Sequence, residues 1–140
     1  MHVTLFKLAT VLLLASASFT AFAGDPPTFR KGMWEFNRTV EGQGTGGKPV
    51  TMTNKKCADP SADMKRMRES LSKQGCKFTV PTVMASTYTV SSECKIQGVP
   101  VQSQSVVTVE SDSAYRVQLT SSGGGRSTRE LLIAKRVGEC

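Results

Sequence analysis

Residues 76–96 read CKFTVPTVMASTYTVSSECKI, and this stretch decides the expected fold. Apolar and polar residues alternate on both sides of Ala85, which is the pattern typical of half-buried β-strands. A hairpin centred on Ala85 places Cys76 opposite Cys94, because both cysteines lie at the same distance from the centre. Both cysteines then fall on the apolar face. The stretch therefore predicts two antiparallel strands joined by a disulfide.

The remaining cysteines, Cys57 and Cys140, form the second expected disulfide. Pairing Cys57 with Cys76 is disfavoured, because the segment 60–74 between them has a helical pattern and a helix of that length spans about 22 Å. The two Cα atoms of a disulfide lie within about 7 Å of each other. No C-x-x-C motif is present, so a catalytic thiol is not expected.

The helical segment has clear boundaries. Asp59 is a suitable N-cap, Pro60 suits the first helical position and Gly75 suits the end. The other expected elements are strands, joined by short turns that imply antiparallel neighbours. They cover residues 33–40, 50–56, 76–83, 87–96, 99–110, 114–121 and 128–137, with Leu131, Ile133 and Val137 sharing a face of the last one.

We thus predict an α+β, mostly β fold. It is an antiparallel β meander of about seven strands, a roll or a partly closed barrel. One α-helix, at about residues 60–74, is inserted after the second strand. No repeat or linker divides residues 24–140, which are expected to form a single domain.

Residues 1–23 have the features of a secretory signal peptide. Lys7 precedes an apolar run, and Ala21-Phe22-Ala23 is an A-x-A cleavage site. The run is short for a membrane-spanning helix, which is the alternative interpretation. We expect an exported, disulfide-bonded, soluble protein that begins at Gly24 and has no transmembrane segment.

Composition excludes several kinds of chemistry. The only histidine is His2, inside the expected leader, so Ser-His-Asp triads and histidine-ligated metals are not expected. Gly42–Lys48 matches the start of a P-loop, but Pro49 replaces the Ser or Thr that binds magnesium. We predict neither an enzyme nor a bound cofactor or metal. Nucleic acid is not an expected partner, because the loops lack aromatic residues for stacking.

Basic residues are concentrated in and beside the expected helix. They are possible contacts for an anionic envelope surface or an envelope protein, and a solvated helix face is the simpler explanation. The set consists of Lys55, Lys56, Lys65, Arg66, Arg68, Lys73 and Lys77.

Aromatic residues on the expected strands allow a second function. Trp34, Phe36, Tyr88 and Tyr115 would line a ligand cavity if the sheet curved around one. They would otherwise be ordinary core residues. The alternative function is therefore a small carrier of apolar, lipid-like ligands.

The sequence resembles a family of exported proteobacterial domains of unknown function, DUF3617. The resemblance rests on Lys31-Gly32-Met33-Trp34-Glu35, on the four spaced cysteines and on the ending Arg136-Val137-Gly138-Glu139-Cys140. It covers essentially all of the chain after the leader, and Lys31 replaces the usual proline. It implies an exported protein and no catalytic residues. The first expectation is thus a non-enzymatic periplasmic protein that acts through surface contacts in the envelope, with its partner unknown.

Overall fold

The structure, a computed structural model, describes residues 22–140. The expected signal peptide lies outside the described residues up to position 21, and its last two residues form a short strand. The elements are β1 (Phe22–Ala23), β2 (Gly32–Gly42), a 3-10 turn (Gln43–Thr45), β3 (Val50–Ala58), α1 (Pro60–Lys73), β4 (Lys77–Phe78), β5 (Thr82–Met84), β6 (Thr87–Ile96), β7 (Val99–Ser111), β8 (Ala114–Gly123) and β9 (Arg126–Gly138).

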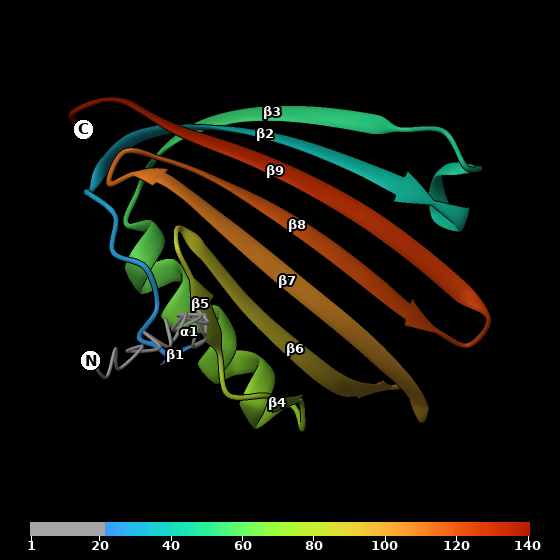
Figure 1. Cartoon of the computed structure of the whole chain (residues 1–140). Coiled ribbons are helices and arrows are strands. Elements are labelled where there is room, and N and C mark those ends of the chain that lie inside the picture. The colour runs from blue at the N-terminus through green and yellow to red at the C-terminus, as the bar shows by residue number, and fades with distance from the viewer. Residues whose placement is uncertain (1–21) are drawn as a thin grey trace, which may run out of the picture.

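All strands belong to one antiparallel sheet. Their order is β1-β5-β6-β7-β8-β9-β2-β3, and β4 pairs with β6 beside this path. The sheet curves, and α1 lies on its inner side beneath one end (Figure 1). The predicted antiparallel meander with one inserted helix is confirmed. The sheet is an open one, because the strands at its two ends, β1 and β3, pair with β5 and β2 and not with each other.

The hairpin of residues 76–96 has the predicted register at its cysteine end, whereas beside the turn β5 is shifted by one residue, so that Thr82 pairs with Thr89. Lys77 is paired with Glu93, which places Cys76 opposite Cys94, and the two form a disulfide with a Cα–Cα distance of 4.2 Å. Ala85 sits in the turn with a φ of 51°. The first strand is interrupted between β4 and β5, where Pro81 lacks the N–H that a sheet ladder needs. This interruption and β1 explain why the sheet has nine strands and not about seven.

The core lies on the inner face, where α1 covers the sheet. Its buried members are Phe29, Trp34, Tyr88, Val107, Tyr115 and Ala134. Leu131 and Ile133 share a face of β9, as predicted, and this is the outer face, because Ala134 is fully buried and Leu132 packs against the core. Residues 131–133 are all apolar, and such a run has no period of two to show which face is buried.

The helix begins and ends where the sequence predicts, within one residue. The Asp59 carboxylate accepts a hydrogen bond from the Ala62 N–H at 3.2 Å, and Pro60 is the first helical residue. Gly75 follows the helix with a φ of 92°. A disulfide lies beyond each end, Cys57–Cys140 before the helix and Cys76–Cys94 after it. Both pairs are those expected from the sequence.

Little of the helix is buried. Pro60 is its only buried residue, Met64 packs against the core and Met67 is 65% exposed. The two disulfides therefore hold α1 at its ends while its middle packs lightly. Among the described residues, no helix is long and apolar enough to cross a membrane.

Candidate functional site

The two ends of the domain meet in a tight clasp. Gly32 has a φ of 155°, and a Cβ there would lie 2.5 Å from both the Arg136 Nε and the Gly138 carbonyl oxygen. Arg136 donates a hydrogen bond from Nε to the Lys31 carbonyl at 2.8 Å, and it also pairs with Glu139 at 2.5 Å. This pairing lowers the pKa of the Glu139 carboxyl. These contacts hold the beginning of β2 against the end of β9.

Trp34 lies beside the clasp and is fully buried. Its indole N–H donates to the Arg30 carbonyl at 3.0 Å. Its ring centroid lies 5.6 Å from that of Tyr115 and 6.3 Å from that of Phe36. Phe29 also belongs to this cluster, and its ring centroid lies 4.4 Å from that of Tyr115. Phe29 has no periodic signal in the sequence, because it lies in an irregular, proline-containing segment.

The four aromatic residues proposed to line a cavity do not enclose one. Trp34, Tyr88 and Tyr115 are buried core residues, and Phe36 packs against them. Burial, with a smaller contribution from the charge of Asp63, raises the pKa of Tyr115 to about 12. Tyr88 alone touches a hollow, a small one of about 290 Å³ beside the segment 25–28. The aromatic set is therefore structural, and the sheet does not close around a ligand.

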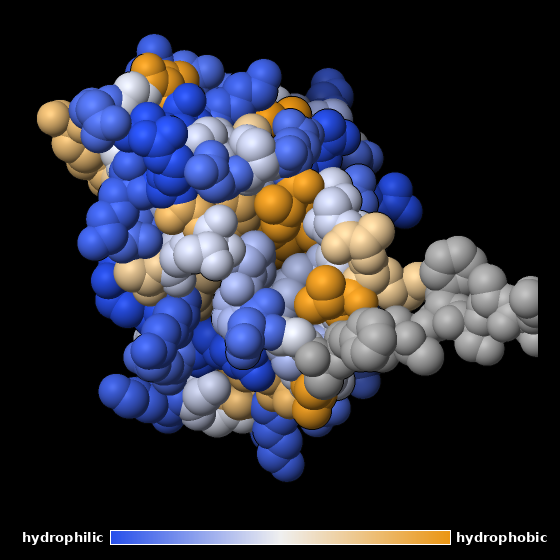
Figure 2. All heavy atoms as spheres, turned by 60° about the vertical axis from the view of Figure 1, so that its left-hand side comes forward, coloured by the Kyte–Doolittle hydropathy of each residue, from blue (hydrophilic) through white to orange (hydrophobic). Residues whose placement is uncertain are grey.

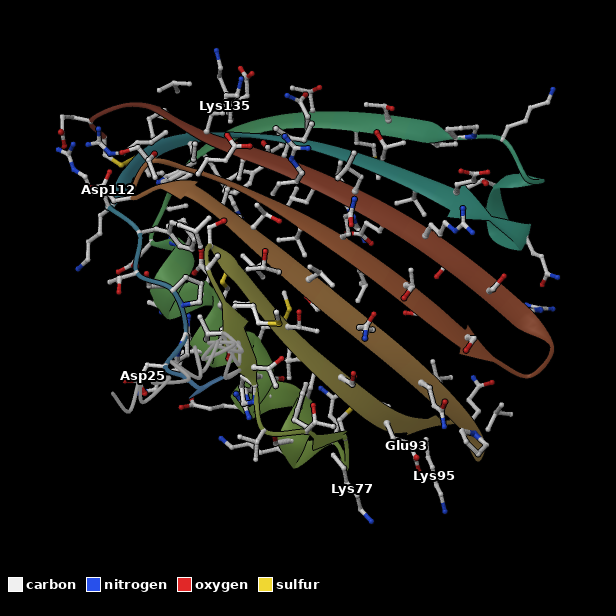
Figure 3. The ribbon with its side chains drawn as sticks, in the orientation of Figure 1. Asp25, Lys77, Glu93, Lys95, Asp112 and Lys135 are labelled. Atoms are coloured by element: carbon white, nitrogen blue, oxygen red, sulfur yellow. A yellow bond between two sulfur atoms is a disulfide. The ribbon has the colours of Figure 1, made fainter. Side chains whose placement is uncertain are left out.

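The predicted basic set is divided by the structure. Lys55 pairs with Glu35 at 3.2 Å and Lys56 lies over the Phe36 ring at 5.7 Å, both on β3. On the helix, Arg66 pairs with Asp63. Arg68 lies 5.3 Å from the centroid of Phe78. Lys65 and Lys73 on α1 and Lys77 on β4 are exposed. Lys77 projects from the lower edge of the sheet, close to Glu93 (Figure 3). Lys55 and Lys56 thus lie on the edge strand β3, and the other five residues lie on α1 and β4.

Two carboxylates, those of Asp59 and Glu110, have structural partners. Asp59 caps the helix, and its Oδ2 lies 3.5 Å from the Lys31 Nζ. Glu110 accepts a hydrogen bond from Arg116 at 3.1 Å. The glycine-rich segment at Gly42 leads through a short turn into β3 and not into a helix, so it lacks the amide-lined helix start that holds a phosphate. In the described part of the chain, no group of three or more potential metal ligands comes together.

An ion pair on the inner face was not anticipated from the sequence. The guanidinium of Arg38 donates to both oxygens of Glu130, at 2.5 and 2.7 Å. This bidentate contact raises the pKa of Arg38, with burial acting in the opposite direction. The two residues are 92 positions apart in the sequence, so only the β2–β9 pairing shows that they meet. The pair lies on the inner face next to the aromatic core, because Arg38 is two residues along β2 from Phe36, which packs against that core.

Two exposed features of the surface could bind a partner or a ligand. The first is the edge strand β3, which pairs on one side only and has eight exposed residues out of nine. The second is a hollow of about 830 Å³ on the inner face, beyond the part that α1 covers. Figure 2 shows that hydrophobic residues on the visible face form small separate patches in a mostly hydrophilic surface. Neither feature was predicted, since each depends on the order of the strands.

A comparison with known families gives one match. The family described as "Protein of unknown function (DUF3617)" matches residues 29–140. The chain belongs to the DUF3617 family. No curated protein and no solved structure matches it.

Several of the residues that carry the resemblance to DUF3617 lie at or beside the clasp. Gly32, Arg136 and Gly138 meet in it, Trp34 is buried beside it, and Cys140 bonds to Cys57. These residues therefore have a structural role. They identify no reactive group, and a function has to be sought on the open surfaces.

Proposed function

We propose that this DUF3617 protein is an exported, non-enzymatic protein that binds an extended, acidic strand of an envelope protein at the free edge of β3. The observation that carries the proposal is the exposure of β3 at the end of the sheet order. A free edge presents unpaired backbone N–H and C=O groups, which pair readily with another extended chain.

The composition of β3 favours a particular partner. Val50 and Met52 are 45% and 50% exposed, and they provide apolar contacts at the beginning of the strand. Residues 48–58 contain three lysines, Lys48, Lys55 and Lys56, and no acidic residue. Lysines on an edge discourage pairing with a second basic edge, and they attract an acidic strand.

Other observations support the remaining parts of the proposal. Two disulfides that join distant parts of the chain agree with an oxidising compartment such as the periplasm. The structural partners of Asp59 and Glu110 leave no evident catalytic pair among the carboxylates considered above. The sequence places a secretory leader before Gly24.

The test uses the oxidised protein and a designed probe. The probe is an acetylated octapeptide in which valine and threonine alternate with glutamate, and the control peptide has lysine in place of glutamate. We expect the acidic peptide to shift the backbone amide signals of residues 50–58 and to slow their hydrogen exchange. Binding should weaken at high salt, because part of it is electrostatic.

A matched pair of variants locates the contact. Met52→Glu places a negative charge on the exposed edge and should reduce the affinity for the acidic peptide at least tenfold. Gln118→Glu adds the same charge to the central strand β8 and should change it less than twofold. Equal affinity for the two peptides contradicts the proposal, and so do amide signals of residues 50–58 that do not shift when the acidic peptide is added. Binding to anionic vesicles through Lys65 and Lys73, without a response of β3, would instead support a lipid surface as the partner.

A further inference from the structure

The large hollow lies on the inner face of the sheet, away from β3. It is formed by residues of β4, β6, β7, β8 and β9. Two strands, β2 and then β3, follow β9 in the sheet order, so the hollow is separate from the proposed β3 edge. Its volume of about 830 Å³ is within the usual range for small-molecule sites.

A row of hydroxyl groups crosses the floor of this hollow. Ser92 is paired with Ser103, Ser103 with Ser121, and Ser121 with Thr128. Directly paired residues point to the same face of a sheet, and Ser92 shares the inner face with buried Tyr88. Four strands therefore contribute one hydroxyl each to a continuous line.

These hydroxyls are partly ordered before any ligand arrives. The Oγ atoms of Ser103 and Ser121 are 2.8 Å apart and hydrogen-bonded, and the side chains of Ser92, Ser103 and Ser121 are half-buried. Each hydroxyl can donate one hydrogen bond and accept others, so the row retains unused capacity. Small side chains also explain why the sheet surface is hollow here.

Phe78 forms one wall of the hollow and continues the same row, because it is paired with Ser92. The Arg68 guanidinium lies on its ring, 5.3 Å from the centroid. The strand β4 has only two residues, and the adjacent Cys76–Cys94 disulfide fixes it to β6. An aromatic ring is thus held at a defined place beside the hydroxyl row.

The lining restricts the ligand by its chemistry. Phe78 is its only large apolar side chain, which gives little contact for a lipid tail. Lys77, Glu93 and Arg129 are each one position from a residue of the row, so their side chains point to the opposite face of the sheet and provide no charge for an anion in the hollow. Four hydroxyl groups and one aromatic ring match a ligand that is uncharged and rich in hydroxyl groups.

We propose that the hollow binds an uncharged oligosaccharide, whose hydroxyl groups pair with Ser92, Ser103, Ser121 and Thr128 and whose ring packs on Phe78. The open shape admits a segment of a longer glycan, because the row runs across the sheet and is not closed at its ends. The affinity is expected to be modest, as the site is open to water.

The test is a titration of the oxidised, isotope-labelled protein with chitotetraose and, separately, with maltotetraose. Binding of either sugar should shift the amide signals around the four hydroxyl residues and Phe78. Signals of residues 50–58 should not move, which separates this site from the β3 edge. No shift with either sugar at about 10 mM overturns the proposal, because a site of millimolar affinity would be mostly occupied at that concentration.

Two substitutions on the same strand face provide the control. Ser103→Val with Ser121→Val removes two central hydroxyls and should weaken binding at least tenfold. Ser105→Val lies two residues along β7 from Ser103, outside the hollow, and should change the affinity less than twofold. Valine is favourable in strands, so both variants should fold. Equal losses in the two variants, or shifts that map elsewhere, would contradict the assignment. Failure of the β3 experiment would leave this result unaffected.

Discussion

Gly32 is the residue at which the beginning and the end of the domain come closest. Its φ of 155° is outside the range that other residues adopt readily, and the space for a Cβ is filled by Arg136 and by the Gly138 backbone. Arg136 cannot move freely, because it is held by the Lys31 carbonyl and by Glu139. The position therefore requires glycine for both conformation and space.

Gly32→Ala should destabilise the protein by about 2–4 kcal/mol, through backbone strain and the displacement of Arg136. Gly44→Ala is the control, because nothing lies within 4 Å of a Cβ at that position. It should change the free energy of unfolding by less than about 0.5 kcal/mol. Urea denaturation of the two variants measures both values. A Gly32→Ala protein as stable as the Gly44→Ala protein would show that the clasp is not tight.

The ionisation of Tyr115 makes the free energy of unfolding depend on pH in the alkaline range. Its pKa is about 12 in the folded protein, compared with about 10 in an unfolded chain. Because the folded pKa is the higher one, the stability it contributes is fully present below pH 10. It is lost as the pH rises from 10 to 12, by about 3 kcal/mol in total.

The comparison of wild type with Tyr115→Phe isolates this effect. The variant has no phenol to ionise, so the difference in unfolding free energy between the two proteins should shift in favour of Tyr115→Phe across this pH range. Thermal or urea unfolding at pH 8 and at several values above pH 10 measures it. A difference that is independent of pH would mean that the Tyr115 hydroxyl reaches water in the folded state.

At the level of the elements, α1 differs from the strands in how it is held. It has one buried residue, Pro60, and a disulfide lies beyond each of its ends. The Cys57–Cys140 bond closes a chain segment of sequence separation 83 and the Cys76–Cys94 bond one of 18. A longer loop restricts the unfolded chain more when it is closed.

Removing each disulfide by a pair of Cys→Ser substitutions should therefore have unequal effects. We expect a loss of about 4.5 kcal/mol without Cys57–Cys140 and about 3 kcal/mol without Cys76–Cys94. Denaturation midpoints of the two double variants measure the order. The reverse order would show that local contacts at β4 contribute more than the restriction of the unfolded chain.

The sequence predicted those elements that have a strong local signal. The hairpin at 76–96 has a symmetric alternation about Ala85, and the helix has a cap, a proline and a terminal glycine. The sequence does not show which residues are buried where this signal is absent. Leu131, Leu132 and Ile133 have no alternation, and buried Ala134 is too small to stand out. Phe29 lies in an irregular segment with no period at all.

The open surfaces were beyond prediction for a different reason. In a simple meander the first long strand would be at the edge, but β2 lies between β9 and β3, so the exposed edge is β3. The hydroxyl row needs the registers of four strands to be known together. The ion pair of Arg38 and Glu130 depends on the same long-range pairing. Local patterns contain none of this information.

On the scale of the whole molecule, curvature divides the inner face into two parts. At one end, α1 and the segment before β2 cover an aromatic core, and at the other end the sheet is uncovered (Figure 1). An open sheet leaves two edges, and the two are unlike. β3 is a long edge, whereas the opposite edge is the two-residue β1, which the sequence assigns to the leader.

Export would therefore change this opposite edge. Cleavage after Ala23 removes β1, whose contacts to β5 are the two pairs Phe22–Val83 and Ala23–Thr82. The core residue Phe29 and the clasp at Gly32 lie after the cleavage point and are retained. The domain should therefore keep its fold when it loses the leader.

We predict that the protein isolated from the periplasm has the mass of residues 24–140 with two disulfides, and that its first residue is Gly24. The small residues at positions 21 and 23 are those that signal peptidase accepts. Mass spectrometry and N-terminal sequencing make the measurement. Ala23→Leu should block cleavage and retain the chain at the membrane, whereas the same change at Ala58, which lies in the domain, should not affect processing. A wild-type chain that keeps residues 1–23 in the membrane fraction would show that the apolar run is an anchor, and β1 would then remain paired to β5.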